Sequence, residues 1–173
     1  FLPALPTLSR ELQAGNGQAQ LSLTGFTSGM AVGQLLAGPL SDGVGRRPLL
    51  AWGSLGVALA ALLAAAAPNL VVLVAGCVVM GLGASFGIVV ARAVLSDLAD
   101  GPVLTRAYAL LGMLTGLGPV LGPAVGVVVM SLWGWRAIFV VMGLLAALCL
   151  AAVLWIVPES LPQHRRIPRS LRA

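Results

Sequence analysis

Apolar segments long enough to cross a lipid bilayer follow one another along most of this chain, separated by short polar stretches. Their charged residues lie at the segment ends, and the segments cover residues 20–37, 49–66, 70–93, 106–130 and 136–157. Roughly 20 consecutive apolar residues are needed to span the hydrocarbon core as an α-helix. The pattern therefore predicts five membrane-spanning helices, followed by a polar, basic segment over residues 158–173.

The composition agrees with a membrane location and excludes a soluble domain. The chain is 59% hydrophobic and 9% charged, with a mean hydropathy of +1.02, whereas soluble domains contain about 25% charged residues. Its sequence pI of about 11.1 would suggest nucleic-acid binding in a soluble protein. In a membrane protein, arginines instead orient the helices.

The arginines fall mainly on one side of the predicted spans. If residues 38–48 face the cytoplasm, the inner segments contain eight of the ten arginines, and the outer segments contain only Arg10 and Arg136. Because cytoplasmic loops are enriched in Lys and Arg, we expect a multi-pass protein of the cytoplasmic (inner) membrane, with loop 38–48 and tail 158–173 inside. The lipid bilayer then accounts for the basic composition, and no nucleic-acid partner is expected.

Residues able to hold a metal ion or to catalyse a reaction are sparse. Cys77 and Cys149 lie inside apolar segments and are interpreted as packing residues, while His164 stands alone in the basic tail. Residues 83–87 match the G-x-S-x-G pattern of serine hydrolases, but that pattern needs a strand-to-helix turn and here falls in mid-helix. We expect no enzyme activity, no metal site and no cofactor.

Three charges lie close together between the first two spans, at Asp42, Arg46 and Arg47. Asp42-Gly43 is a dipeptide typical of turns, and Gly45 allows a left-handed or closely approached backbone. Pro48 suits the first turn of the next helix. Residues 38–48 are therefore predicted as a tight turn, in which the arginines either only orient the helix hairpin or also latch a moving helix end.

Arg92 and Asp97 lie where the third span leaves the membrane. A charge at a helix centre costs roughly 2.5–3.5 kcal/mol on insertion scales, so charges are placed more favourably near a span end. Arg92 could simply extend its side chain to the membrane surface. Alternatively, the pair contacts the charges of loop 38–48.

The fourth span is rich in regularly spaced glycines. Small residues four apart line one helix face and allow a second helix to approach closely, and two prolines bend the helix by removing backbone donors. The face of Gly118, Gly122 and Gly126 serves either static packing or a moving contact. The whole glycine- and proline-rich segment comprises Gly112, Gly116, Gly118, Pro119, Gly122, Pro123 and Gly126.

Weakly polar, methionine and phenylalanine side chains in three spans form a candidate substrate surface. Such side chains suit loosely bound amphipathic molecules, but they equally suit contacts between helices. The candidates are Thr24, Thr27, Ser28 and Gln34 in the first span, Met80, Ser85 and Phe86 in the third, and Met113 and Thr115 in the fourth.

The spacing Gly38-x-x-x-Asp42-x-x-Gly45-Arg46-Arg47 resembles the loop between the second and third helices of the major facilitator superfamily. The resemblance implies a cytoplasmic gating latch, in which the acid and the following arginine pair with charges at a neighbouring helix end and hold the outward-facing state. Arg92 and Asp97 would then belong to the latch, with Asp97 as a partner of Asp42 and Arg46. Gly43 stands where the family usually has Arg or Lys.

Further motifs are similar to the bicyclomycin/chloramphenicol-resistance branch of drug:proton antiporters. They are residues 2–6 (LPALP), 33–35 (GQL), 38–42 (GPLSD), 45–48 (GRRP), the glycine ladder of the fourth span and 134–139 (GWRAIF). The glycine ladder resembles the antiporter motif of this superfamily, although the usual final Gly-Gly is Gly126-Val127 here.

This resemblance implies an all-α integral membrane fold, the N-terminal six-helix half of a facilitator-type transporter with its first helix mostly missing. Residues 1–157 would form the helical bundle and residues 158–173 a basic cytoplasmic central-loop segment. The implied function is export of small hydrophobic or amphipathic compounds by proton antiport with alternating access, with a missing C-terminal six-helix half as partner. A transporter of sugars or metabolites, or a truncated half that does not transport, is the alternative.

One position departs from the family pattern. The fourth helix of these antiporters carries an arginine tied to proton coupling, in a pattern like Arg-x-x-Gln-Gly, whereas this chain has Cys77 and Met80 at the two polar positions. If the proton gradient drives transport, we expect its carrier in the missing first helix or in the second half.

Overall fold

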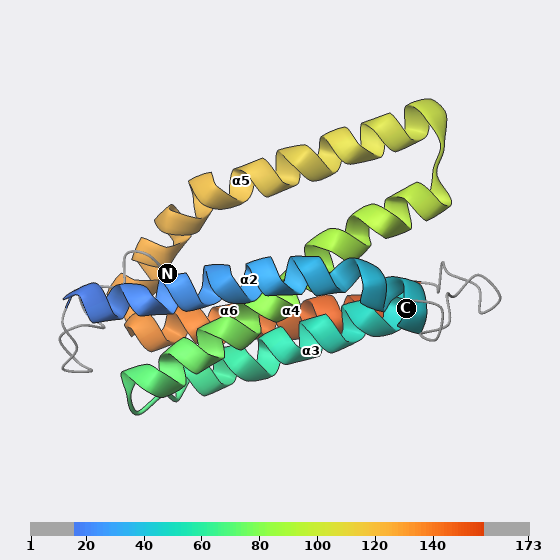
Figure 1. Cartoon of the computed structure of the whole chain (residues 1–173). Helices are drawn as coiled ribbons and strands as arrows, with labels where there is room; N and C mark the ends of the chain where they lie inside the picture. The colour runs from blue at the N-terminus through green and yellow to red at the C-terminus, as the bar shows by residue number, and fades with distance from the viewer. Residues whose placement is uncertain (1–15, 158–173) are drawn as a thin grey trace.

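The computed structural model describes residues 16–157, which form five α-helices joined by short connections (Figure 1). The helices are α2 (Asn16–Val44), α3 (Arg46–Ala65), α4 (Leu70–Leu98), α5 (Gly101–Trp133) and α6 (Trp135–Trp155). The all-α prediction is confirmed. The expected remnant of a first helix and the basic segment 158–173 lie outside the described residues.

Four of the five helices are long and apolar enough to cross a membrane by length and composition, namely α3, α4, α5 and α6. Helix α2 corresponds to the predicted span 20–37 but is not among them. Glutamine, serine and threonine residues such as Gln20, Ser28 and Gln34 interrupt its apolar sequence, which lowers its mean hydropathy. The prediction of five spans is therefore supported for four.

The connection between α2 and α3 is shorter than the predicted turn over residues 38–48. The backbone N–H of Gly45 still donates to the carbonyl of Ser41 at 3.0 Å, so the helical pattern continues through Asp42 and Gly43 to Val44. The interpretation of Asp42-Gly43 as a turn is wrong. Gly45 alone makes the turn with a φ of 114°, a conformation that favours glycine.

Helices α2, α3, α4 and α6 form the packed part of the molecule. Helix α2 packs mainly on α4, and α3 packs on both α4 and α6. The main apolar core lies among α3, α4 and α6, where Cys77 and Met80 belong to the same buried cluster as Trp135 and Phe139. Trp135 and Phe139 themselves meet edge to face, with ring centroids 6.0 Å apart.

Glycines allow the backbones of α2 and α4 to touch. A Cβ added at Gly29 would overlap the carbonyl oxygen of Val78, and a Cβ added at Gly81 would overlap that of Phe26. A similar approach joins α3 to α4, because a Cβ at Gly53 would lie 2.9 Å from the carbonyl oxygen of Gly83. These helices therefore pack through their main chains.

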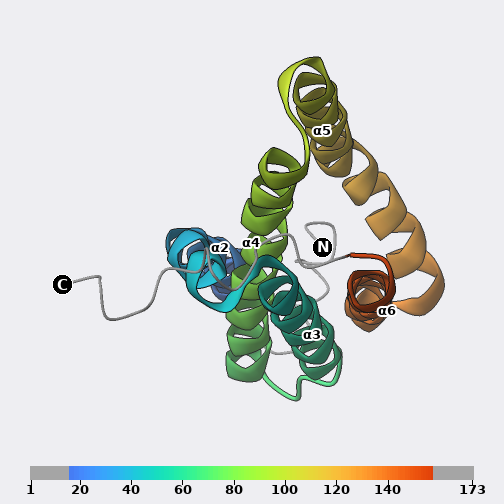
Figure 2. The same cartoon turned by 90° about the vertical axis from the view of Figure 1, so that its right-hand side faces the viewer.

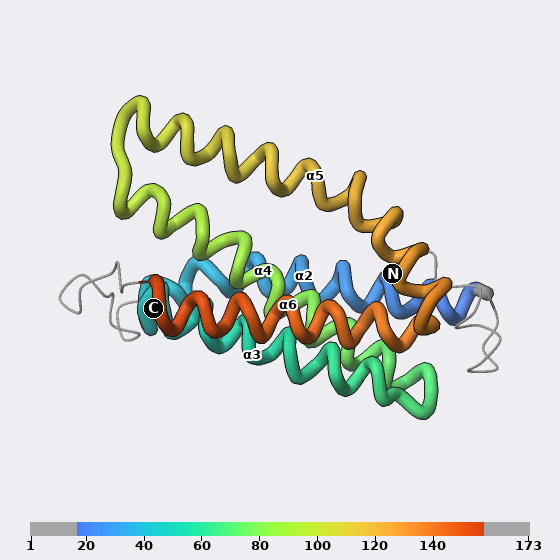
Figure 3. Tube along the Cα trace, turned by 180° about the vertical axis from the view of Figure 1, so that it is seen from behind, coloured from blue at the N-terminus to red at the C-terminus, as the bar shows by residue number. Residues whose placement is uncertain are grey.

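Helix α5 leans away from the other four (Figure 2). It starts beside the end of α4, makes few contacts with the other helices, and buries only Gly126 of its 33 residues. Pro119 and Pro123 lie inside the helix, and Figure 3 shows that α5 changes direction on its way to α6. The expected bend is present, and it directs the end of α5 toward α6.

Candidate functional site

Charged residues gather at one end of the helices. Among the described residues, seven of the eight charged side chains lie at the end where α2, α4 and α6 finish and α3 and α5 begin, on the right in Figure 1. We call this the charged end; its charged residues are Asp42, Arg46, Arg47, Arg92, Asp97, Asp100 and Arg106. The remaining residue, Arg136, lies at the opposite end, where its guanidinium stacks on the Trp135 ring at 4.2 Å from the centroid.

Arg46 joins three helices at the charged end. Its Nη1 donates to Asp42 Oδ1 of α2 at 2.7 Å, and its Nε donates to Asp97 Oδ2 of α4 at 3.1 Å. Asp42 lies in the last turn of α2 and Arg46 is the first residue of α3, so the tight turn at Gly45 keeps the two side chains close together. The structure thus brings together the three residues that the resemblance grouped.

Burial makes this ion-pair network more than a surface contact. The Arg46 side chain is 12% exposed, and those of Asp42 and Asp97 are 38% and 27% exposed. Exposed ion pairs contribute about 0–1 kcal/mol, whereas hydrogen bonds to charged groups that are shielded from water contribute about 1.5–3 kcal/mol. Two acids on one half-buried arginine hold α2, α3 and α4 in a fixed arrangement.

Ser41 is a further member of the network that sequence reasoning missed. It is 1% exposed, its Oγ donates to the carbonyl of Gly38 at 2.9 Å, and the same oxygen accepts a hydrogen bond from Arg46 Nη1. A buried serine preceding a charged aspartate has no sequence pattern of its own. Its role becomes visible only in the structure, where Arg46, five residues later, donates a hydrogen bond to its hydroxyl.

The neighbouring Arg47 reaches in a different direction from Arg46. Its Nη2 donates to the main-chain carbonyl of Leu154, in the last turn of α6, and its Nε is buried without a hydrogen-bond partner among the described residues. Arg46 therefore contacts α2 and α4, while Arg47 contacts α6. Both arginines start from the first turn of α3.

Arg92 is exposed and contributes its main chain to the charged end. Its carbonyl accepts a hydrogen bond from the Tyr108 hydroxyl at 3.1 Å, which links α4 to the first turns of α5. No hydrogen bond between the Arg92 guanidinium and the Asp42–Arg46–Asp97 network is present among the described residues. Tyr108, the single tyrosine of the chain, was missed because an isolated tyrosine near a span end has no specific pattern.

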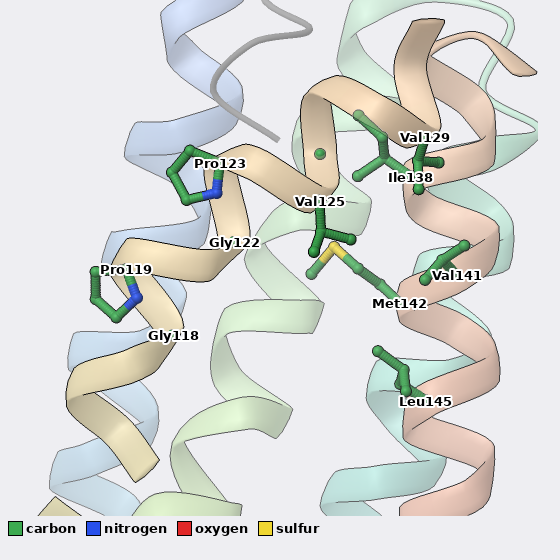
Figure 4. Close-up of a pocket in the computed structure, with 11 residues that line it drawn as sticks. Gly118, Pro119, Gly122, Pro123, Val125, Val129, Ile138, Val141, Met142 and Leu145 are labelled. Carbon is green, nitrogen blue, oxygen red and sulfur yellow. The ribbon is translucent and has the colours of Figure 1, made fainter. Parts of the chain in front are cut away.

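The glycine face of α5 is open. Within residues 16–157, a Cβ added at Gly112, Gly116, Gly118 or Gly122 would meet nothing within 4 Å. Gly118, Gly122 and Gly126 line one side of an apolar pocket of about 450 Å³, and residues of α6 line the other side. Val125 of α5 and Met142 of α6 point into the space between the two helices (Figure 4).

The candidate substrate surface separates into two groups in the structure. Thr24, Thr27, Ser28 and Gln34 are exposed on α2, and Met113 and Thr115 are exposed on α5. In contrast, the three candidates on α4 are buried, namely Met80, Ser85 and Phe86. Met80 and Phe86 belong to apolar clusters, and Ser85 Oγ donates to the carbonyl of Leu82 at 2.6 Å. Met80, Ser85 and Phe86 thus lie in the contacts of α4 with its neighbours, and their contact with a substrate stays a prediction.

The part of the chain that the structure describes has no cluster of side chains that could hold a metal ion. No three His, Cys, Asp or Glu side chains lie together in residues 16–157. Cys77 is buried in the core and Cys149 is exposed.

Comparisons with known proteins agree with this architecture. The family model described as "Major Facilitator Superfamily" matches residues 1–172. The chain is 36% identical to an uncharacterized MFS-type transporter YdgK of Bacillus subtilis, 32% identical to a bicyclomycin resistance protein homolog of Haemophilus influenzae and 33% identical to multidrug resistance protein D of Escherichia coli. These alignments cover 99%, 99% and 94% of this chain.

The chain spans less than half the length of these relatives, at 43%, 43% and 41% respectively. The fold also resembles the crystal structure of a human organic anion transporter, MFSD10 (TETRAN), with a TM-score of 0.74 over 95% of this chain and 39% of that one. At 24% identity, this likeness concerns the fold alone.

Proposed function

The chain belongs to the major facilitator superfamily, and on that premise we propose that it is the part of an exporter that contains the gating latch. The transported compounds are small and hydrophobic or amphipathic, and the driving force is proton antiport with alternating access. Two of the relatives are named for multidrug or bicyclomycin resistance, which supports an efflux substrate class. Because the chain spans 43% and 41% of those relatives, the proposal concerns transport by a protein of their full length.

The observation that carries this proposal is the contact of Arg46 with both Asp42 and Asp97. A half-buried arginine between two acids on different helices is stable while the helices stay together, and breaking it exposes three charges to new partners. Alternating access needs such a bistable contact. In the proposed mechanism, the network is closed in the outward-facing state and opens when the inner gate opens.

The orientation follows from the arginines of the described helices. Four of them lie at the charged end and one at the opposite end, so the positive-inside rule favours a cytoplasmic charged end. Cysteines introduced at Val103 and at Leu132, exposed residues near the two ends of α5, test this in a variant whose native cysteines are serine. A membrane-impermeant maleimide applied to intact cells should label Leu132→Cys and leave Val103→Cys unlabelled. The reverse result contradicts the orientation.

The proposed proton carrier lies outside α2–α6. Every aspartate and arginine of the described residues is near a helix end, and Cys77 fills the apolar core at the position where related antiporters have a coupling arginine. Efflux by the complete protein should stop when a protonophore collapses the proton gradient. Efflux that continues under a protonophore points to another driving force and leaves the latch proposal standing.

The decisive test of the latch is Asp42→Asn in the complete protein, measured as efflux of a fluorescent lipophilic cation. Asparagine keeps the size of aspartate and removes its charge, and the loss of a charged hydrogen bond costs about 1.5–3 kcal/mol. We expect the efflux rate to fall about tenfold or more, since 1.4 kcal/mol corresponds to a factor of ten. Asp97→Asn should act in the same direction.

Asp100→Asn is the matched control for these variants. Asp100 is exposed at the same end and forms no salt bridge among the described residues, so its neutralisation should leave efflux unchanged. If Asp42→Asn is expressed normally and exports dye at the rate of Asp100→Asn, the latch function is wrong. A panel of dyes, sugars and organic acids tests the substrate class separately.

A further inference from the structure

Arg47 of α3 donates a hydrogen bond to a main-chain carbonyl at the C-terminal end of α6. Its guanidinium donates to the Leu154 carbonyl, 107 residues away in the last turn of α6. In a continuing helix, the N–H of the residue four positions later would donate to that carbonyl. That residue is Pro158, which has no N–H to donate.

The charge of Arg47 also suits this position. The C-terminal end of a helix carries the negative end of the helix dipole, and a positive charge there stabilises it by about 0.3–1 kcal/mol at exposed sites. The last turn of α6 has no basic residue of its own. Arg47 thus provides from α3 the C-terminal cap that α6 lacks.

Few other contacts fix the last residues of α6. Val153 is buried at 8% exposure, but Trp155 and Ile156 beyond it are 89% and 77% exposed. The Ile156 N–H still donates to the Ala152 carbonyl at 2.8 Å, so the helix is regular up to this point. Past Val153, the main chain of α6 accepts the Arg47 hydrogen bond from α3 at Leu154.

We propose that Arg47 is a positioning residue that fixes where α6 ends, and that it joins this end to the gating latch held by its neighbour Arg46. The two arginines contact different helices: Arg46 binds α2 and α4, and Arg47 binds α6. The proposed consequence for transport rests on the function proposed above. The cap itself does not, since it can be measured without transport.

Hydrogen exchange of the last turn of α6 tests the cap in the purified complete protein. Arg47→Gln keeps a polar side chain but removes the charge and the reach of the guanidinium. We expect the amides of residues 152–157 to exchange about tenfold faster, because hydrogen bonds to charged groups contribute about 1.5–3 kcal/mol. Arg47→Lys keeps a charged donor and should restore most of the protection.

Pro158→Ala provides a rescue that is specific to the cap. Alanine restores an N–H at position 158 that a longer α6 could donate to Leu154, so we expect the double variant Arg47→Gln/Pro158→Ala to exchange more slowly at 152–157 than Arg47→Gln alone. The double variant also keeps the test available if the single variant does not accumulate. Arg106→Gln is the control, because Arg106 is an exposed arginine at the same end.

Two results would overturn the proposal. One is unchanged exchange at residues 152–157 in Arg47→Gln, and the other is an equal increase in Arg106→Gln. Efflux measured on the same variants tests the link to the latch, and we expect a several-fold decrease in Arg47→Gln with recovery in Arg47→Lys. If exchange responds and no variant exports dye, the cap stands and the proposed function fails.

Discussion

Helices α2 and α5 both carry glycines at intervals of four residues, yet their surroundings are opposite. In α2 the series is Gly25, Gly29 and Gly33, and all three face α4 at distances that exclude or crowd a Cβ. In α5 the series is Gly118, Gly122 and Gly126, and a Cβ at Gly118 or Gly122 would meet nothing within 4 Å. The same spacing thus produces a closed interface in one place and an open face in the other.

The closed interface depends on main-chain contact. A Cβ at Gly33 would lie 2.8 Å from the Leu82 carbonyl and would overlap Ser85 Oγ. Since lipid tails are as apolar as leucine, helices in a membrane associate through close packing rather than through the hydrophobic effect. Helices α2 and α4 therefore hold together because the glycines of α2 let main-chain and side-chain atoms of α4 approach its backbone closely.

The glycine face of α5 has the small residues of a helix–helix interface, but no helix among the described residues packs closely against it. Its glycines, the bend at Pro119 and Pro123 and the pocket beside α6 all lie on a helix that buries almost nothing. Small residues permit a close approach, but they do not determine which helix approaches. The comparison indicates that the α2 ladder stabilises this chain, while the α5 ladder is available for movement or for chain outside residues 1–173.

Gly29→Ala should produce the largest effect on stability. The new Cβ would overlap the Val78 carbonyl oxygen, and main-chain atoms cannot move aside as a flexible side chain can. Overpacking costs typically about 1–3 kcal/mol and occasionally more, which exceeds the gain of about 1 kcal/mol from replacing glycine in a helix. We expect a lower melting temperature and little mature protein in the membrane.

Gly17→Ala is the control for this variant, since Gly17 lies in the same helix and a Cβ there meets nothing within 4 Å. Equal melting temperatures for Gly29→Ala and Gly17→Ala would contradict the closed interface.

The sequence predicted the helices well and their partners poorly. Positions of four spans follow from the length of apolar runs, and the grouping of Asp42, Arg46 and Asp97 followed from a family resemblance. The α2 ladder was missed although Gly25, Gly29 and Gly33 have the spacing that drew attention to α5. Spacing marks a face as small, whereas contact depends on which helix lies opposite.

The hydrogen bond from Arg47 to the Leu154 carbonyl could not be predicted from the sequence, because a main-chain acceptor has no sequence pattern. The turn over residues 38–48 was predicted too long for a related reason. Asp42 and Gly43 favour turns when considered alone, but the helical hydrogen bond from Gly45 to Ser41 and the pairing of Asp42 with Arg46 stabilise a longer α2.

Gly122→Ala should separate stability from transport. The added methyl group meets no atom of the described residues within 4 Å, and alanine favours the helix by about 1 kcal/mol relative to glycine. We expect an unchanged or slightly raised melting temperature. If the α5 face contacts a moving part of the complete protein, efflux should fall several-fold in the same sample, whereas unchanged efflux would show that the face tolerates a methyl group and is not a close contact.

Tyr108→Phe tests how α5 is held to the other helices. The substitution removes only the hydroxyl that donates to the Arg92 carbonyl, and one such hydrogen bond contributes about 0.5–1.5 kcal/mol. Because α5 has few other contacts near its start, we expect faster hydrogen exchange in residues 101–110 and no change in α2. An equal response of α2 and α5 would mean that α5 is not an independent unit.

Ser85→Ala should have the smallest effect, and it decides between packing and substrate contact for the candidates on α4. Ser85 Oγ bonds to the Leu82 carbonyl within its own helix, so the helix retains its main-chain bonds when the hydroxyl is removed, and we expect a stability change within about 1 kcal/mol. Efflux of every dye in the panel should stay at the normal rate. A selective loss for one dye at normal stability would mean that Ser85 reaches the substrate in another state of the transporter, and that the α2–α4 interface opens during transport.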